Sequence, residues 1–137
     1  MKQKWMIISG SFAVVLGVSL WASAEPKSSG SAKAFKPVMN TEHLMHGQKK
    51  LMDDIKSAIG EKDWKAGQTA AWVLAELANV NHYQKDDAAY RGFADTMSKQ
   101  CVDLAAMLSK KDEKGAKDAV NAIGKTCGAC HDQFEKK

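Results

Sequence analysis

Proline is nearly missing from this chain of 137 residues, which has only two, and none follows Pro37. From that residue onward the chain also has almost no alternation of apolar and polar residues, the pattern of half-buried strands. Apolar residues recur instead at intervals of three and four, which is the spacing of one face of an α-helix. The lack of helix breakers together with this period predicts an all-α fold.

Dense basic runs are missing as well. The chain has 20 Lys and Arg against 16 Asp and Glu, a formal net charge of +4. Residues 1–24 hold two of the basic residues and no acidic one, so the charge of the remainder falls to +2. This balance excludes the strong basic patch of a nucleic-acid-binding protein, and we expect no nucleic-acid partner.

Cysteine is scarce, and two of the three cysteines lie close together near the end of the chain, in the sequence Cys127-Gly-Ala-Cys130-His131. The pattern C-x-x-C-H is the attachment signature of a c-type haem. Its two thiols add across the two vinyl groups of a haem and form two thioethers. The histidine that follows then lies under the iron, so we expect His131 to be the proximal ligand.

Other interpretations of this motif explain fewer of its residues. A redox C-x-x-C would follow a strand in a βαβ pattern, which the chain lacks. A closed zinc site needs four ligands, and no second Cys/His pair has the required spacing. A disulfide between Cys127 and Cys130 leaves His131 unexplained. The motif therefore predicts covalently bound haem c, while Cys101 on an apolar helix face is expected to be a buried thiol without nucleophilic function.

The first 24 residues have the pattern of a secretory signal peptide. Lys2 and Lys4 precede an apolar run that ends at Trp21, and Ala22-Ser23-Ala24 forms a cleavage site. An uncleaved membrane anchor is the alternative, but serines and glycines interrupt the run. We expect cleavage after Ala24, a periplasmic location and no membrane contact afterwards. Export agrees with haem attachment, which takes place outside the bacterial cytoplasmic membrane. Residues 25–37 are expected to be a flexible lead-in.

Residues that favour helix N-caps precede four segments with helical period: Asn40, Asp63, Asp86 or Asp87, and Asp112. Gly60 is expected to end the first helix. The connections are short, so the four helices form an antiparallel up-down-up-down bundle over residues 38–137. The C-x-x-C-H motif lies on the apolar face of the last helix, which predicts that haem is bound at one end of this bundle.

The second axial position of the iron depends on which residues lie at that end of the bundle. In this topology the end of the last helix lies beside the start of the first helix, the end of the second and the start of the third. Candidates near the iron are Met39, His43, Met45, His46, His82, Tyr90 and Phe93. Met45 shares its inward face with Gln48 and Met52, and Met52 lies roughly 10 Å further along the helix axis.

Met45 is therefore our candidate for the distal iron ligand. Two alternatives stay open, namely ligation by His43 or His46, and an iron without a second protein ligand in which Met45 only packs over the site. Lys49 and Arg91 also lie near this end, where a positive charge suits the haem propionates.

A bundle whose last helix carries C-x-x-C-H, here continuing as Cys130-His131-Asp-Gln-Phe134, resembles the class II c-type cytochromes, the cytochrome c′ family. The resemblance covers residues 38–137. Members of this family are exported bacterial haem proteins. Some are six-coordinate electron carriers with a methionine ligand on the first helix, and others are five-coordinate and bind nitric oxide or carbon monoxide.

From this resemblance we expect a periplasmic mono-haem electron carrier that exchanges electrons with redox partner proteins. The alternative is a five-coordinate protein that binds nitric oxide or carbon monoxide. We expect no enzymatic activity, because no catalytic constellation accompanies the haem motif. Trp72 lies off the apolar face of its helix, and the family's habit of dimerising makes it a candidate homodimer contact.

Overall fold

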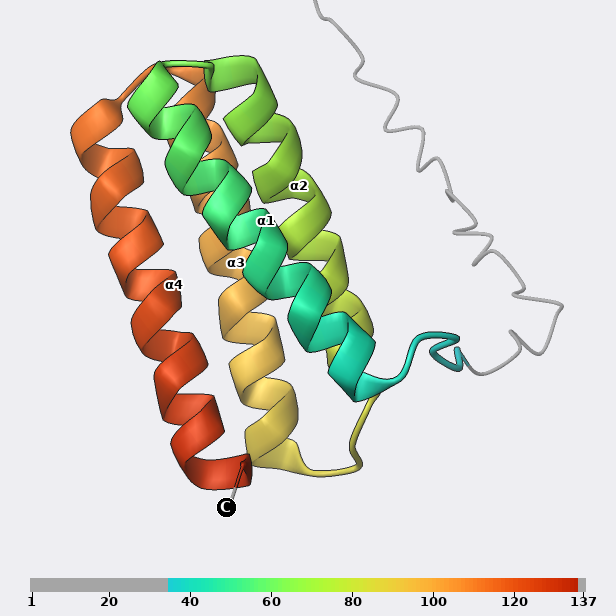
Figure 1. Cartoon of the computed structure of the whole chain (residues 1–137). Coiled ribbons are helices and arrows are strands. Elements are labelled where there is room, and N and C mark those ends of the chain that lie inside the picture. The colour runs from blue at the N-terminus through green and yellow to red at the C-terminus, as the bar shows by residue number, and fades with distance from the viewer. Residues whose placement is uncertain (1–34, 136–137) are drawn as a thin grey trace, which may run out of the picture. The chain divides into compact units, whose positions relative to one another are not determined.

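The computed structural model describes residues 35–135, which fold into four helices. These are α1 (Thr41–Glu61), α2 (Trp64–Asn81), α3 (Ala88–Ser109) and α4 (Glu113–Phe134), and no strand occurs in this part of the chain. Figure 1 shows them as an antiparallel bundle, which confirms the predicted up-down-up-down fold. The predicted signal peptide, residues 1–24, and most of the lead-in lie outside the described residues.

Each helix begins at a side chain that accepts a hydrogen bond from a backbone N–H of the first turn. The four caps are Asn40, Asp63, Asp87 and Asp112. Such caps satisfy N–H groups that have no partner within the helix. All the predicted starts are confirmed, and Asp87 rather than its neighbour caps α3.

The two tight connections, α1 to α2 and α3 to α4, have the same conformation. Lys62 and Lys111 both adopt the left-handed region, with φ of 59° and 57°. In each connection the N–H of the next residue returns to the carbonyl five residues earlier, at 2.8 Å and 3.0 Å, the bond that defines a Schellman motif. Gly60 as the end of α1 was therefore wrong, since the helix continues through Glu61 and the left-handed residue is a lysine.

The core follows the predicted apolar faces. Its largest fully buried side chains come from all four helices: Leu44, Ile55, Leu74, Cys101, Leu104, Leu108 and Ile123. A Cβ on Gly67 would come within 3.3 Å of Ala58 Cβ, so the absence of a side chain there allows α2 to pack closely on α1.

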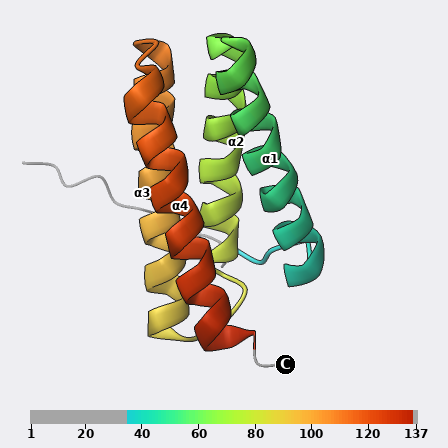
Figure 2. The same ribbon diagram turned by 60° about the vertical axis from the view of Figure 1, so that its left-hand side comes forward.

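Packing between the helices is uneven. α2 packs on both α1 and α3, and α4 packs on α3, whereas α1 and α4 touch at few points. Figure 2 shows the same order, with α4 beside α3 and α1 beside α2. The seam between α1 and α4 is thus the part of the bundle that its own side chains fill least.

The segment that leads into α1 is attached to the α2–α3 connection. The Phe35 ring lies edge-on to Tyr83 with 4.8 Å between centroids. The Gln84 side-chain amide donates a 2.8 Å hydrogen bond to the Met39 carbonyl. Phe35, in the expected lead-in, thus contacts the α2–α3 connection although its side chain is 56% exposed. Within residues 35–135 no helix has both the length and the hydrophobicity needed to cross a membrane.

Candidate haem site

The C-x-x-C-H motif lies within the last turns of α4, as predicted. Because Cys130 and His131 lie three and four residues after Cys127, about one helical turn, the three side chains face the same side. Cys130 is 9% exposed and Cys127 is half-buried, whereas the side chain of His131 is 50% exposed. All three residues line one cavity.

This cavity has a volume of about 650 Å³ and lies where α1 and α4 are not in close contact. Its walls come from α1 between Thr41 and Lys56, from α3 between Tyr90 and Met97, and from the end of α4. The volume is in the range of small-molecule and cofactor sites. The cavity therefore opens at the bundle end that the topology predicted for the haem.

The two motif thiols are neutral groups. Burial raises the pKa of Cys127, and burial followed by the neighbouring Cys127 raises the pKa of Cys130. Redox-active C-x-x-C pairs have a lowered pKa instead, because the thiolate is their reactive form. The electrostatics thus disfavour a disulfide-exchange function for this motif.

Cys101 is the third thiol, and it is fully buried in α3 outside the cavity wall. Burial, with a smaller contribution from Cys127, raises its pKa to about 12. A thiol in this state is protonated at any physiological pH and is a poor nucleophile. The prediction of a buried, unreactive cysteine is confirmed as far as its burial is concerned.

His131 has a carboxylate next to one ring nitrogen. Its Nδ1 lies 3.5 Å from Oε2 of Glu135, the C-cap residue of α4. An acidic partner at one imidazole nitrogen orients the ring and leaves the other nitrogen for a metal. Nε2 is therefore the atom of His131 that is available to an iron in the cavity.

The wall opposite the motif belongs to α1. Met45, Gln48 and Met52 line the cavity there, with Met45 half-buried and the other two buried. Of the other predicted distal candidates, His46, Tyr90, and Phe93 also line the cavity.

Three distal candidates do not reach the cavity wall. His43 Nδ1 lies 2.7 Å from Asn40 Oδ1 at the helix cap, and His82 Nδ1 lies 2.7 Å from Asp95 Oδ1. Met39 is 43% exposed. Met45 and His46 therefore line the same cavity as the motif, whereas His43 does not.

Sequence reasoning did not place Met52 or Asn81 at the cavity, although both residues line it. Met52 was set aside because it lies two turns beyond Met45, but the cavity extends along α1 as far as Lys56. Asn81, at the end of α2, is 5% exposed and accepts a 2.6 Å hydrogen bond from the Tyr90 hydroxyl. The sequence signal for Asn81 was its place on the apolar face of α2, three residues after the buried Ala78.

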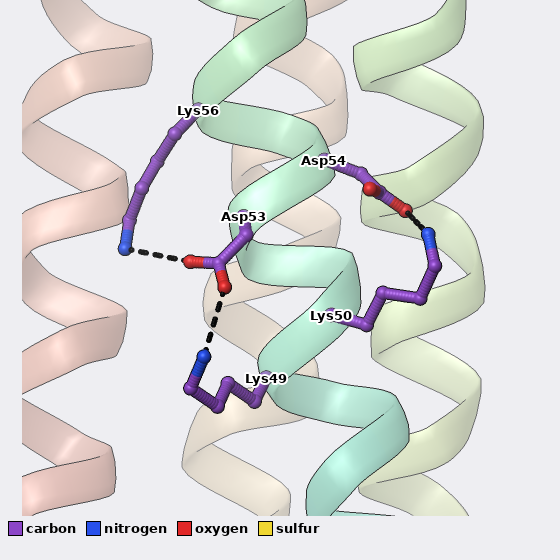
Figure 3. Close-up of polar contacts among 5 residues, drawn as sticks. All are labelled: Lys49, Lys50, Asp53, Asp54 and Lys56. Atoms are coloured by element: carbon purple, nitrogen blue, oxygen red, sulfur yellow. Dashed lines mark hydrogen bonds and ion pairs between the residues drawn. The ribbon is translucent and has the colours of Figure 1, made fainter.

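Charged residues of α1 form the rim of the cavity. Figure 3 shows Asp53 between two lysines, with Lys49 Nζ at 3.2 Å and Lys56 Nζ at 3.4 Å. The Lys49 ammonium, more than Lys56, lowers the pKa of Asp53. All three side chains are exposed, so these pairs stabilise the fold little. Arg91, the other predicted propionate partner, pairs with Asp86 and does not line the cavity.

The residues present fit a haem. One wall offers two thiols one turn apart and an imidazole, and the opposite wall offers thioethers. Gln48, a polar residue on the α1 wall, has its amide Nε2 buried without a hydrogen-bond partner among the described residues. Lysines at the rim suit acidic groups at the edge of the cofactor.

Comparison with known proteins supports this fit. The family model described as Cytochrome C′ matches residues 82–135, which include α3, α4 and the connection before them. No curated protein and no solved structure gave a significant match. The resemblance to the cytochrome c′ family is confirmed over the matched residues, and this family implies a haem c cofactor.

Proposed function

We propose that this chain, whose residues 82–135 match the Cytochrome C′ family model, is an exported mono-haem c-type cytochrome that carries electrons. When bound, the haem supplies an iron that cycles between Fe(III) and Fe(II). The observation that carries the proposal is that Cys127, Cys130 and His131 line one cavity opposite Met45.

In this proposal the α4 wall holds the cofactor. Cys127 and Cys130 would hold the haem through two thioether bonds, and His131 would supply an imidazole nitrogen to the iron. The buried ring of Tyr90 packs edge-on against the half-buried ring of Phe134, with 5.3 Å between centroids, and this pair limits the access of water at this end. Burial and the axial ligands are the means by which a protein adjusts the reduction potential of a haem.

Met45 is the proposed distal ligand. It lies on the α1 wall, and a thioether ligand together with an imidazole would favour the reduced state and raise the potential, which suits an electron carrier. Periplasmic location follows from the predicted signal peptide at residues 1–24. Electron exchange with redox partner proteins is part of the same proposal.

Optical spectra of the purified, exported protein test this function. We expect a low-spin oxidised form with a weak sulfur-to-iron band at the red end, and a reduced form that takes up carbon monoxide slowly. A high-spin oxidised form whose reduced state binds carbon monoxide at once would contradict electron carriage through a Met45-ligated iron.

A second function has one specific observation in its favour. A five-coordinate protein that binds nitric oxide or carbon monoxide needs space and suitable groups on the distal wall. Gln48, a polar residue whose amide Nε2 has no hydrogen-bond partner among the described residues, lies on that wall. The same spectra distinguish the two functions.

A further inference from the structure

Glu135 occupies an unusual place for a carboxylate. It is the C-cap residue of α4, where the unpaired carbonyls of a helix end carry partial negative charge and favour cations. Its Oε2 nevertheless lies 3.5 Å from Nδ1 of His131. The backbone N–H of Glu135 also donates a 2.8 Å hydrogen bond to the His131 carbonyl. Main chain and side chain therefore both connect Glu135 to the expected iron ligand.

The two histidines of the cavity differ in their partners. His46 and His131 both line the cavity, from α1 and α4. Of these two, only His131 has a carboxylate within ion-pair distance of its ring among the described residues. Glu135 lines the same cavity. The carboxylate thus accompanies the histidine that the C-x-x-C-H motif assigns to the iron.

A carboxylate at the second nitrogen of a ligating imidazole has two effects. It accepts the proton-bearing nitrogen as a hydrogen-bond donor, which fixes the tautomer and the orientation of the ring. It also makes the ligand more basic. A more basic ligand and a nearby negative charge both stabilise Fe(III) relative to Fe(II), so the reduction potential falls.

The separation and the exposure of the pair set the size of these effects. A normal N–H···O hydrogen bond is roughly 2.7–3.2 Å long, so 3.5 Å is the distance of an ion pair. The Glu135 side chain is 74% exposed, so packing does not prevent its carboxylate from closing on the ring. Solvent also screens an exposed charge, so the expected effect is modest.

We propose that Glu135 is a positioning residue, which accepts a hydrogen bond from the Nδ1–H of His131, presents Nε2 to the iron and lowers the reduction potential. This proposal rests on the proposed haem function. The two walls of the cavity then act on the potential in opposite directions. Met45 on α1 raises it, and Glu135 at the end of α4 lowers it.

The reduction potential of the haem-loaded protein is measured by spectroelectrochemical titration. Glu135→Gln removes the charge and keeps the length of the side chain. We expect it to shift the Fe(III)/Fe(II) equilibrium about threefold towards Fe(II), the effect of one exposed ion pair. That shift is a rise of roughly 28 mV, at 59 mV per tenfold change for one electron. Glu135→Asp keeps the charge and should shift the equilibrium less than Glu135→Gln does.

Asp132→Asn is the matched control. Asp132 follows His131 directly and is also exposed, but its carboxylate has no ion pair with the His131 ring. Its neutralisation should shift the equilibrium less than about 1.5-fold, because only screened charge is lost. Equal shifts in the Glu135→Gln and Asp132→Asn proteins would overturn the proposal, since they would show a general effect of charge.

The iron–histidine stretching vibration provides a second measurement, which a general effect of charge does not change. Resonance Raman spectra of the reduced Met45→Leu protein report it with one axial position free. Adding Glu135→Gln to this protein should lower the frequency, because the imidazole becomes a weaker donor without its carboxylate partner. Adding Asp132→Asn should leave the frequency unchanged.

Two further results would overturn the role of Glu135 while haem remains attached. One is a potential that Glu135→Gln leaves unchanged. The other is a changed potential with an unchanged iron–histidine frequency, which indicates charge without contact to the ring. Failure of the proposed function is seen separately, because a parent protein without covalent haem shows its bare polypeptide mass before any titration and ends this proposal as well.

Discussion

The Tyr90 hydroxyl donates a 2.6 Å hydrogen bond to Oδ1 of Asn81 and so joins the first turn of α3 to the last turn of α2 at the haem end of the bundle. The Tyr90 ring also packs edge-on against Phe134 of α4. Burial, ahead of the nearby Cys130, raises the pKa of Tyr90. One side chain thus connects three helices where the cavity opens.

Tyr90→Phe should lower the free energy of unfolding by about 1–2 kcal/mol, because it leaves Asn81 buried without its donor. Urea unfolding of the haem-free chain measures this loss. Tyr83→Phe is the control, since Tyr83 is 54% exposed and should tolerate the change. Equal losses of unfolding free energy in the two variants would show that the buried hydrogen bond between Tyr90 and Asn81 does not stabilise the fold.

The left-handed lysines predict a gain in stability. Lys62→Gly should raise the free energy of unfolding by roughly 0.5–1 kcal/mol, because glycine adopts a positive φ without the penalty of a Cβ. Lys99→Gly, at an exposed site inside α3, should lower it by about 1 kcal/mol. Thermal unfolding measures both changes in stability. A lower stability of the Lys62→Gly variant would contradict the penalty that we assign to the Cβ of Lys62.

Helix starts were predictable because their signal is local. Asn40, Asp63 and Asp112 each cap the helix that follows within three residues. The end of α1 was not predictable from Gly60. The left-handed residue is Lys62, and its position is set by the Schellman hydrogen bond from the Asp63 N–H to the Ala58 carbonyl. A glycine near the end of a helix therefore does not locate that end when the hydrogen bonds of the whole connection place it elsewhere.

The candidate site divides in the same way. Cys127, Cys130 and His131 form a contiguous motif, so their convergence on one cavity followed from helical spacing. Met52 and Asn81 reach that cavity through the packing of different helices, which spacing along one segment does not reveal. The polar Gln48 was visible on an apolar stripe, but the missing partner of its Nε2 needed the tertiary structure.

Stability at high pH should depend on Cys101. Its pKa in the folded chain is about 12, whereas an unfolded thiol titrates near 8.5. The folded state therefore keeps a proton that the unfolded state loses, so stability is complete below about pH 8.5 and falls as the pH rises towards 12.

Cys101→Ala should reduce this loss between pH 7 and pH 10, although it lowers stability at both values by leaving a small cavity. Urea midpoints of the haem-free chain at the two pH values measure the difference. A pH dependence identical to that of the parent chain would contradict the role of the buried thiol.

The distal ligand is tested by two matched methionine variants. Met45→Leu should turn the oxidised haem protein high-spin and allow the reduced form to bind carbon monoxide rapidly, because the iron loses its proposed thioether ligand. Met52→Leu, on the same wall of the cavity, should leave both spectra unchanged. If Met52→Leu alone opened the iron, the ligand would be Met52.

The most direct measurement is the intact mass of the exported protein, taken together with acid–acetone extraction of the haem. The account predicts a polypeptide beginning at Glu25 that carries one haem, which extraction does not remove. Cys101→Ser should retain that haem, whereas the double variant Cys127→Ser/Cys130→Ser should lose covalent attachment. Haem that extracts freely from the parent protein, or a mass without haem, would contradict the assignment of Cys127, Cys130 and His131 as its binding site.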